Sequence, residues 1–380
     1  MRSIKELKNL SGKKVIIRAD FNVPIKPAST EGGDGKVLDD FRIKKAIPTI
    51  EYLQKKGAKI IIISHLSDNG EGSLLPAGQV VKKYIKNFEF IKTPLFSNET
   101  EKRINSLKKG EVVLLENLRT ETGEKKNSPS FARALSRYGE IYVNEAFSES
   151  HREYASIVGI TKHLPGYAGL QFISEIENLS KVFSPAHPFL LIIGGAKFET
   201  KIPMVKKFLR QADNIFIGGA IANDFFRAKG YEVGISLVGE NNFQTPQLLK
   251  SKNLILPSDV EVTKNSKNHI TRPSDVMPDE CIVDIGPQSI LLLKDLINKA
   301  GFVLWNGPLG KYEEGFGGAT EEVLKIISKS KAENVIGGGD TVDLISKLKI
   351  EKKLGFVSTG GGATLEFLAK GTLPGIRALK

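Results

Sequence analysis

Short runs of apolar residues recur along the whole chain, and within each run the apolar positions are continuous rather than alternating with polar ones. Continuous hydrophobicity is typical of strands that helices cover on both faces. We expect nine such strands, over residues 15–17, 60–63, 112–115, 141–143, 190–193, 215–217, 254–256, 302–304 and 356–357.

Amphipathic segments lie between these runs. Residues 42–56 place apolar side chains at helical spacing on one face, and the pattern ends at Gly57. Residues 201–211 follow the same period. Alternation of buried strands with amphipathic helices predicts an open, parallel α/β sheet. The chain contains too many such units for one sheet, so we expect two.

The division between the two sheets is marked by breaks in the pattern. Residues 164–169 and 184–188 are rich in glycine and proline, and a helical pattern over 175–183 lies between them. We therefore predict two doubly wound, Rossmann-like lobes joined by one hinge helix. The first lobe covers residues 1–168, and the second covers residues 169–361 and includes the hinge helix.

Composition agrees with this organisation. A chain of 380 residues is long enough for two domains, and 40% apolar residues provide ample core for both. No apolar run approaches the roughly 18 residues of a membrane span. The first residues lack the apolar core of a signal peptide, so we expect an intracellular, cytoplasmic protein. A single cysteine excludes an intramolecular disulfide.

The charge balance raises the question of a polyanionic partner. The net charge is +12, and a basic protein can bind nucleic acid. However, the lysines and arginines are spread along the chain and do not collect in a tail or alternate with aromatic residues. A small polyanionic substrate explains the excess of positive charge at least as well.

A glycine-rich turn follows another short apolar run near the end of the chain. Gly337, Gly338 and Gly339 lead into Asp340 and Thr341, which open a predicted helix. Bare backbone amides and the positive end of the helix dipole attract phosphate. A carboxylate there repels a bare phosphate but suits one that arrives with Mg²⁺. The pattern indicates a metal–nucleotide site, although a left-handed glycine turn without a ligand explains the glycines alone equally well.

Two further strand ends in the second half carry glycine pairs. The run 190–193 is followed by such a pair and then by Lys197 and Lys201, which are one helical turn apart and can direct positive charge at a phosphoryl group. Gly218 and Gly219 follow the next strand. Neither segment is a Walker A loop or a G-x-G-x-x-G fingerprint. Common nucleotide motifs are therefore absent, although phosphate-binding chemistry is present.

In the first half, cationic side chains follow four predicted strands. They are Arg18, His65, Arg119 and the pair His151-Arg152. Ligands of open α/β sheets bind beyond the carboxyl ends of the strands, and arginine binds phosphate or carboxylate with two hydrogen bonds. Any one of these residues can be a surface cation or a structural histidine. Together they indicate an anionic ligand.

No serine, cysteine or lysine lies in the sequence signature of an activated nucleophile. Phosphoryl transfer to an acceptor that is already ionised needs no such group. Positioning and neutralisation of charge carry that reaction.

These motifs together resemble the phosphoglycerate kinase family over essentially the whole chain. In chain order they are Arg18-Ala-Asp20-Phe-Asn22-Val-Pro24, Ser64-His65-Leu66, Leu115-Glu-Asn117-Leu-Arg119, Asn144-Glu-Ala-Phe147 with His151-Arg152, Gly194-Gly-Ala-Lys197 with Lys201, Trp305-Asn306-Gly307-Pro308, Gly337-Gly-Gly-Asp340-Thr341 and Ser358-Thr359-Gly360-Gly361-Gly362-Ala363.

The resemblance implies reversible phosphoryl transfer between 1,3-bisphosphoglycerate with ADP and 3-phosphoglycerate with ATP, in glycolysis and gluconeogenesis. It also implies Mg²⁺ as cofactor, a carboxylate acceptor, and hinge closure that brings the substrates together and expels water. A monomer without a nucleic-acid or membrane partner is the family habit. The alternative is a non-catalytic paralogue or a basic nucleic-acid-binding protein on the same fold.

By resemblance, each site residue has an expected role. The residues expected to bind phosphoglycerate are Arg18, Asp20, Asn22, Arg42, His65, Arg119 and Arg152. Those expected to bind the nucleotide are Gly195, Lys197, Lys201, Gly218, Gly219, Asn306, Pro308, Glu313, Gly337, Gly338, Gly339, Asp340 and Thr341, with Asp340 as the Mg²⁺ ligand. Those expected to act in the transfer itself are Arg42, Lys197, Lys201, Gly339 and Gly362.

Two further expectations come from the resemblance. The C-terminal segment, about residues 362–380, should fold back onto the first lobe. The chain also departs from the family pattern after His65, where Ser67-Asp68-Asn69 replaces Gly-Arg-Pro. An acid in place of a substrate-binding arginine loses a contact worth on the order of 1.5–3 kcal/mol. We therefore expect weaker binding of 3-phosphoglycerate unless a nearby cation compensates.

Overall fold

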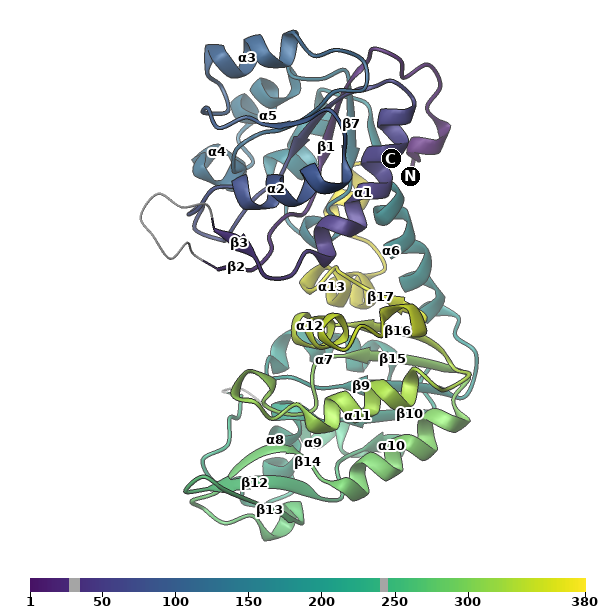
Figure 1. The fold of residues 1–380 in the computed structure, drawn as a ribbon. Helices are drawn as coiled ribbons and strands as arrows, with labels where there is room; N and C mark the ends of the chain where they lie inside the picture. The colour runs from purple at the N-terminus through teal and green to yellow at the C-terminus, as the bar shows by residue number, and fades with distance from the viewer. Residues whose placement is uncertain (27–34, 240–244) are drawn as a thin grey trace. The chain divides into compact units, whose positions relative to one another are not determined.

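The computed structural model describes residues 1–26, 35–239 and 245–380, and these residues form two compact units (Figure 1). The first unit comprises Met1–Glu177 and Thr372–Lys380, and the second comprises Asn178–Gly371. The chain therefore divides within helix α6 (Leu170–Ser180) rather than at residue 168. Helix α13 (Gly362–Lys370) belongs to the second unit, so the returning segment begins at Thr372 instead of near residue 362.

The first unit is built around a six-stranded sheet in the order β5-β6-β4-β1-β7-β8. All neighbouring strands are parallel. The strands are β1 (Lys14–Arg18), β4 (Lys59–Ile63), β5 (Phe88–Phe90), β6 (Val112–Leu114), β7 (Ile141–Asn144) and β8 (Gly166–Ala168). A separate two-stranded ribbon pairs β2 (Ile25–Lys26) with β3 (Lys36–Val37).

The helices of the first unit alternate with these strands. They are α1 (Phe41–Lys55), α2 (Leu75–Tyr84), α3 (Asn98–Asn105), α4 (Thr122–Lys125), α5 (Pro129–Ser136) and α14 (Pro374–Arg377). The apolar face of α1, including Ile43, Ile50 and Leu53, packs with the isoleucines of β4 in one buried core. This is the face that the helical period of residues 42–56 predicted.

The second unit contains a second six-stranded parallel sheet, in the order β11-β10-β9-β15-β16-β17. Its strands are β9 (Phe189–Ile193), β10 (Asn214–Ile217), β11 (Leu254–Ile255), β15 (Phe302–Asn306), β16 (Glu333–Gly337) and β17 (Phe356–Val357). Its helices, besides α13, are α7 (Phe198–Phe208), α8 (Gly219–Ala228), α9 (Thr245–Leu248), α10 (Pro287–Lys299), α11 (Gly318–Ile327) and α12 (Gly339–Leu348).

A small antiparallel sheet completes the second unit. It has the order β13-β12-β14 and consists of β12 (Val260–Lys264), β13 (Lys267–Thr271) and β14 (Cys281–Ile285). The sequence analysis did not predict it. Strand β13 has no buried residue, so its sequence lacks a continuous apolar run, whereas β14 is completely buried and its apolar run was overlooked.

The predicted fold class, with two parallel doubly wound sheets, is confirmed, and each of the nine predicted strands is present. Three local predictions were wrong: one edge strand was missed, and two helices begin earlier than expected. Residues 164–169 contain an edge strand, β8, because edge positions tolerate glycine and proline nearby. The linking helix begins at Leu170 instead of 175. Helix α7 begins at Phe198, whose buried ring packs in the first turn.

In the described part of the chain no helix is long and apolar enough to cross a membrane.

The C-terminal segment is held in the first unit by backbone hydrogen bonds and buried leucines. The Gly375 N–H donates to the Ser150 carbonyl at 2.8 Å, and the Arg2 N–H donates to the Leu379 carbonyl at 3.4 Å. A Cβ at Gly375 would lie 2.6 Å from the Ser150 side chain, so glycine allows this approach. Leu373 and Leu379 are fully buried. The chain end thus packs beside the loop that follows β7.

The carboxylate of Glu145, just after β7, caps the N-terminus of α6. Its two oxygens accept from the backbone N–H groups of Gln171 and Phe172, each at 3.1 Å, and the Thr49 hydroxyl donates to it as well. Burial raises the pKa of Glu145 to about 7, although these hydrogen bonds act to lower it. Glu145 therefore links the loop after β7 to the helix in which the chain divides.

We expect Glu145→Ala to lower the free energy of unfolding by about 1–2 kcal/mol, because two helix N–H groups and a hydroxyl lose their acceptor. The folded-state pKa lies above the unfolded value, so ionisation makes Glu145 less stabilising as pH rises toward 7. The difference from wild type should therefore be larger at about pH 5.5 than at about pH 8. Urea unfolding followed by circular dichroism measures both. Glu177→Ala, at an exposed site on the same helix, is the control, and an equal loss in both variants would contradict the capping role.

Candidate functional site

The cations that follow the strands of the first sheet lie together. Arg18 ends β1 and is fully buried, and His65 lies two residues beyond the end of β4. Arg18 donates from Nε to the Ser156 hydroxyl at 2.8 Å, and its Nη2 lies 3.0 Å from His65 Nδ1. The Ser156 hydroxyl in turn donates to the buried carboxylate of Glu124. This chain of contacts fixes the orientation of the Arg18 guanidinium.

The contact with Arg18 determines which nitrogen of His65 carries the proton. Arginine only donates, so His65 Nδ1 must accept, and the neutral ring then has its N–H at Nε2. Burial and the Arg18 charge hold the pKa of His65 well below its usual range. Among the described residues Nε2 has no hydrogen-bond partner. A buried donor without an acceptor is suited to an oxygen of an anionic ligand.

Asp20, Asn22 and Arg42 form the neighbouring part of the site. Arg42, on α1, donates to the Asp20 carboxylate at 2.9 Å. Burial acts to raise the pKa of Asp20, but the charge of Arg42 and hydrogen bonds from the Ser148 hydroxyl and the Asn22 N–H lower it to about 2. Asp20 is therefore ionised and orients Arg42. The Asn22 side chain accepts from the Ser67 N–H at 3.0 Å.

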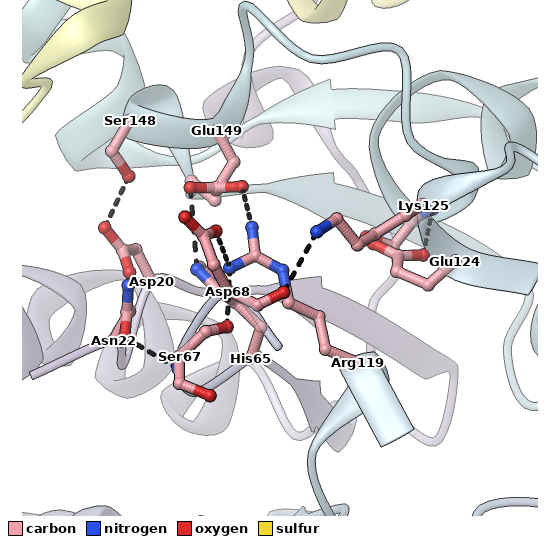
Figure 2. A network of polar contacts seen from close by, with 12 residues as sticks. Asp20, Asn22, His65, Ser67, Asp68, Arg119, Glu124, Lys125, Ser148 and Glu149 are labelled. Atoms are coloured by element: carbon pink, nitrogen blue, oxygen red, sulfur yellow. Dashed lines mark hydrogen bonds and ion pairs between the residues drawn. The ribbon is translucent and has the colours of Figure 1, made fainter. Parts of the chain in front are cut away.

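Arg119 lies in the 3₁₀ turn after β6 (Leu118–Thr120) and is surrounded by acceptors from the protein itself (Figure 2). Its Nη1 donates to the Ser67 carbonyl at 2.7 Å and to the Asp68 carboxylate at 2.9 Å. Its Nη2 donates to the Glu149 carboxylate at 2.7 Å. Arg152 is exposed, and its backbone N–H donates to the Glu149 carbonyl at 2.9 Å. Four of the predicted cations, Arg18, Arg42, His65 and Arg119, thus belong to one polar network.

Sequence analysis missed several members of this network, namely Glu124, Lys125, Glu149 and Ser156. Asp68 was recognised as unusual, but its pairing with Arg119 was not predicted. The sequence did carry one signal for Glu149, because an acid lies within the Asn144–Arg152 motif beside residues expected to bind an anion. Its partner lies 30 positions earlier in the chain, so only the fold brings the two together.

In the second unit, the turns after neighbouring strands contact one another through their backbones. The Gly195 N–H, after β9, donates to the Pro308 carbonyl, after β15, at 2.6 Å. The Gly219 N–H, after β10, donates to the Leu309 carbonyl at 3.1 Å. A Cβ at Gly219 would lie 2.4 Å from the Gly195 nitrogen, and its φ is +61°, so glycine is required there. The predicted residues Gly195, Gly218, Gly219 and Pro308 are therefore brought together.

Lys201 lies inside this group of turns. Its side chain is buried on α7, and Nζ donates to the Gly194 carbonyl. Burial lowers the pKa of Lys201 to about 8, with the Asp340 charge acting to raise it and the Lys197 charge to lower it further. Lys197 is exposed at the N-cap position, just before the first residue of α7, so the prediction that both lysines lie on one helix face was wrong.

Helix α12 begins at the glycine-rich turn after β16, as predicted. Gly338 is its N-cap residue with φ +106°, and Gly339, Asp340 and Thr341 form its first turn. Thr341 is fully buried, and within the described residues its hydroxyl has no hydrogen-bond partner. The first turn thus offers unpaired N–H groups, a buried hydroxyl and a carboxylate to a ligand.

The remaining predicted residues of the second unit lie around the same edge of the sheet or nearby. Asn306 and Gly337 end β15 and β16, and Gly362 begins α13 after β17. Glu313 is exposed in the short turn Tyr312–Glu314. The N-termini of α7, α8, α12 and α13 all follow strands of one parallel sheet, so their positive ends share one edge.

A cluster of cations in one α/β unit, and helix N-termini along one edge of the parallel sheet in another, are the arrangement expected of a phosphotransferase with two α/β domains. The family model for phosphoglycerate kinase matches residues 4–371, and the chain belongs to the phosphoglycerate kinase family. The phosphoglycerate kinase of Coprothermobacter proteolyticus is 38% identical over 100% of this chain and 98% of its own length. The phosphoglycerate kinase of Pseudothermotoga lettingae is 39% identical over 99% of this chain and 98% of its own length. The crystal structure of the Pyrococcus horikoshii phosphoglycerate kinase matches this chain with a TM-score of 0.86 and a sequence identity of 30%. The match covers 100% of this chain and 98% of the Pyrococcus chain.

Proposed function

We propose that the first unit of this kinase binds the phosphoglycerate substrate and the second unit binds ADP or ATP together with Mg²⁺. The observation that carries this proposal is the complementary chemistry of the two units. The first offers buried arginines and a neutral histidine donor, and the second offers helix N-termini with a buried lysine. The hinge closure expected from the resemblance stays a prediction, as do a monomeric state and a cytoplasmic location.

The phosphoglycerate would be held by charge-assisted hydrogen bonds from Arg18, Arg42, Arg119 and Arg152 and by the N–H of His65. Asp20 would then hold Arg42 in position, and Asn22 would hold the Ser67 backbone. Both side chains would also accept hydrogen bonds from hydroxyl groups of the substrate. A planar guanidinium binds two oxygens of a phosphate or carboxylate at once, which favours this substrate class.

The nucleotide would lie against the turns after β9, β10, β15 and β16. Thr341 and the N–H groups of Gly338 and Gly339 fit a phosphate, because the Thr341 hydroxyl is buried without a partner in the described part of the chain. Asp340 fits Mg²⁺ as a single hard oxygen ligand. Among the described residues no group of three or more acidic, histidine or cysteine side chains is placed so that it could hold a metal ion, so the remaining ligands would come from the phosphates and water. Bound Mg²⁺ supplies charge neutralisation of the phosphate oxygens.

In the transfer, a carboxylate oxygen of 3-phosphoglycerate forms a bond to the γ-phosphorus as the bond from that phosphorus to the ADP oxygen breaks. No proton moves, in agreement with the missing general base. Lys197, Lys201 and Arg42 would neutralise charge on the transferred group, and the N–H groups at Gly339 and Gly362 would bind its oxygens.

Turnover that requires ATP, Mg²⁺ and 3-phosphoglycerate, with 1,3-bisphosphoglycerate consumed by a coupled dehydrogenase, tests the proposed function. We expect saturation by both substrates. Binding of Mg²⁺–ATP without turnover at any concentration of 3-phosphoglycerate would instead show that the fold serves another function.

Asp68→Arg is expected to lower the apparent KM for 3-phosphoglycerate by about two- to fivefold. The change removes an acid from Arg119 and adds a cation beside it, but the Asp68 side chain is 84% exposed, and exposed pairs contribute only about 0.2–1 kcal/mol. Lys125, whose ammonium contacts the Asp68 carbonyl at 2.9 Å, already supplies some positive charge here. Steady-state kinetics measures the effect. Asp68→Asn separates loss of the acid from gain of the cation, and an unchanged or higher KM in Asp68→Arg would refute the idea.

A further inference from the structure

Glu149 is an acid within a cluster that is otherwise arranged to bind an anion. It ends the 3₁₀ turn Phe147–Glu149 after β7. One carboxylate oxygen accepts from Arg119 Nη2 at 2.7 Å, and the other lies 3.5 Å from His65 Nε2 (Figure 2). These are two of the groups expected to bind the phosphoglycerate. The Glu149 carboxylate therefore lies where an anionic ligand would be expected to make its contacts.

Burial distinguishes Glu149 from Asp68, the other acid on Arg119. The Asp68 side chain is 84% exposed, whereas those of Glu149 and Arg119 are 13% and 2% exposed. An exposed ion pair is screened by water and contributes little, but a buried pair is screened much less. The contact between Arg119 and Glu149 is therefore the stronger of the two.

The surroundings of Glu149 come from several elements. Arg18 on β1, Arg119 on the turn after β6, and Arg152 act to lower its pKa, whereas the Asp20 charge acts to raise it, and His65 lies beside it. Burial is the largest influence and leaves the pKa of Glu149 above its ordinary value. The surrounding cations therefore do not fully compensate the burial of the Glu149 carboxylate.

We propose that Glu149 sets the affinity of this site, because its carboxylate occupies Arg119 in the absence of a ligand and the incoming anion must displace it. The proposal rests on the proposed function in one respect only, namely that phosphoglycerate is that anion. Displacement would free an N–H of Arg119 Nη2 and give the Nε2–H of His65 an unobstructed acceptor. The phosphoglycerate would gain these contacts, but breaking the ion pair between Arg119 and Glu149 would reduce the net free energy of binding.

An opposite role can be distinguished by experiment. If Glu149 instead holds Arg119 in the orientation that the ligand needs, its neutralisation would weaken binding, because Arg119 would lose its buried partner. Competition and orientation therefore predict changes of opposite sign in the same variant.

The test compares wild type with Glu149→Gln, which keeps the shape and removes the charge. Glu149→Ser is a second variant, so that the test does not depend on the folding of one protein. The matched control is Glu153→Gln. Glu153 is an exposed acid four residues further along the chain, and this substitution removes the same charge. Isothermal titration calorimetry measures the dissociation constants of 3-phosphoglycerate, sulfate and Mg²⁺–ADP for each full-length protein whose melting temperature shows that it is folded.

We expect Glu149→Gln to bind both 3-phosphoglycerate and sulfate about tenfold more tightly than wild type, equivalent to about 1.4 kcal/mol. The affinity of Glu149→Gln for Mg²⁺–ADP should equal that of wild type. The Glu153→Gln variant should bind all three ligands as wild type does. In kinetics the apparent KM for 3-phosphoglycerate should fall while the KM for ATP stays the same. Equal or weaker sulfate binding in both Glu149 variants would overturn the proposal. Tighter sulfate binding with no 3-phosphoglycerate binding in any protein would uphold it and reject the proposed substrate.

Discussion

Replacing Asp340 by alanine is expected to reduce turnover by about 10³-fold and to abolish the dependence of nucleotide binding on Mg²⁺. Asp340 lies in the first turn of α12, one residue before the buried hydroxyl of Thr341. A hard divalent cation needs oxygen ligands, and this carboxylate is the one that the turn supplies. Calorimetric titration with ADP, with and without Mg²⁺, measures the effect on binding, and the coupled assay measures turnover.

The matched control for Asp340 is Glu322→Ala, which removes an exposed acid from α11 in the same unit. Metal-free ADP should bind Asp340→Ala at least as well as wild type, because the carboxylate repels a bare phosphate near the helix N-terminus. If ADP still bound more tightly with Mg²⁺ than without it in the variant, the metal would have to be held elsewhere.

The fold was predictable from the sequence wherever one local pattern decided the structure. The strands β1, β4, β9 and β15 are nearly or completely buried, so their sequences are continuous apolar runs. β8 was missed because it is a short edge strand with one glycine, and its pairing with β7 comes from tertiary contacts. The linking helix begins earlier than predicted because Glu145 caps it from a distant loop. No helix-start signal within the helix itself records that cap.

The candidate site was predictable to a different extent in each unit. In the second unit the phosphate-binding groups are backbone amides at strand–helix turns, and glycines in the sequence mark them directly. In the first unit the cations were found from their positions after strands, but their partners were not. Glu149 and Asp68 reach Arg119 from separate segments, and Ser156 reaches Arg18 from the short π-helix Ala155–Gly159. Sequence positions give the chemistry of such groups, whereas the fold alone gives their pairing.

Lys201→Met is expected to lower kcat by about 10²–10³-fold and at the same time to make the protein more stable. Methionine keeps the length of the side chain but removes the charge that would neutralise the transferred phosphoryl group. Burial lowers the pKa of Lys201 to about 8 from 10.5, so folding disfavours the charged form. A shift of this size makes the charged lysine cost on the order of 3 kcal/mol of folding free energy near pH 7. Urea unfolding of wild type and variant measures that difference.

The pH dependence of both effects separates Lys201 from a surface lysine. Because the folded-state pKa lies below the unfolded one, the destabilisation is fully present below about pH 8 and disappears as pH rises toward 10.5. The stability gain of Lys201→Met should therefore shrink between these limits. Wild-type affinity for Mg²⁺–ADP should fall as pH rises through about 8, since the free protein then loses the Lys201 proton, whereas the affinity of the variant should not change over that range. Lys206→Met, at an exposed position on the same helix, should show neither effect. A variant with normal kcat would remove Lys201 from the transfer step, and a variant with no gain in stability would show that the buried ammonium is better compensated by Gly194 and Asp340 than its lowered pKa indicates.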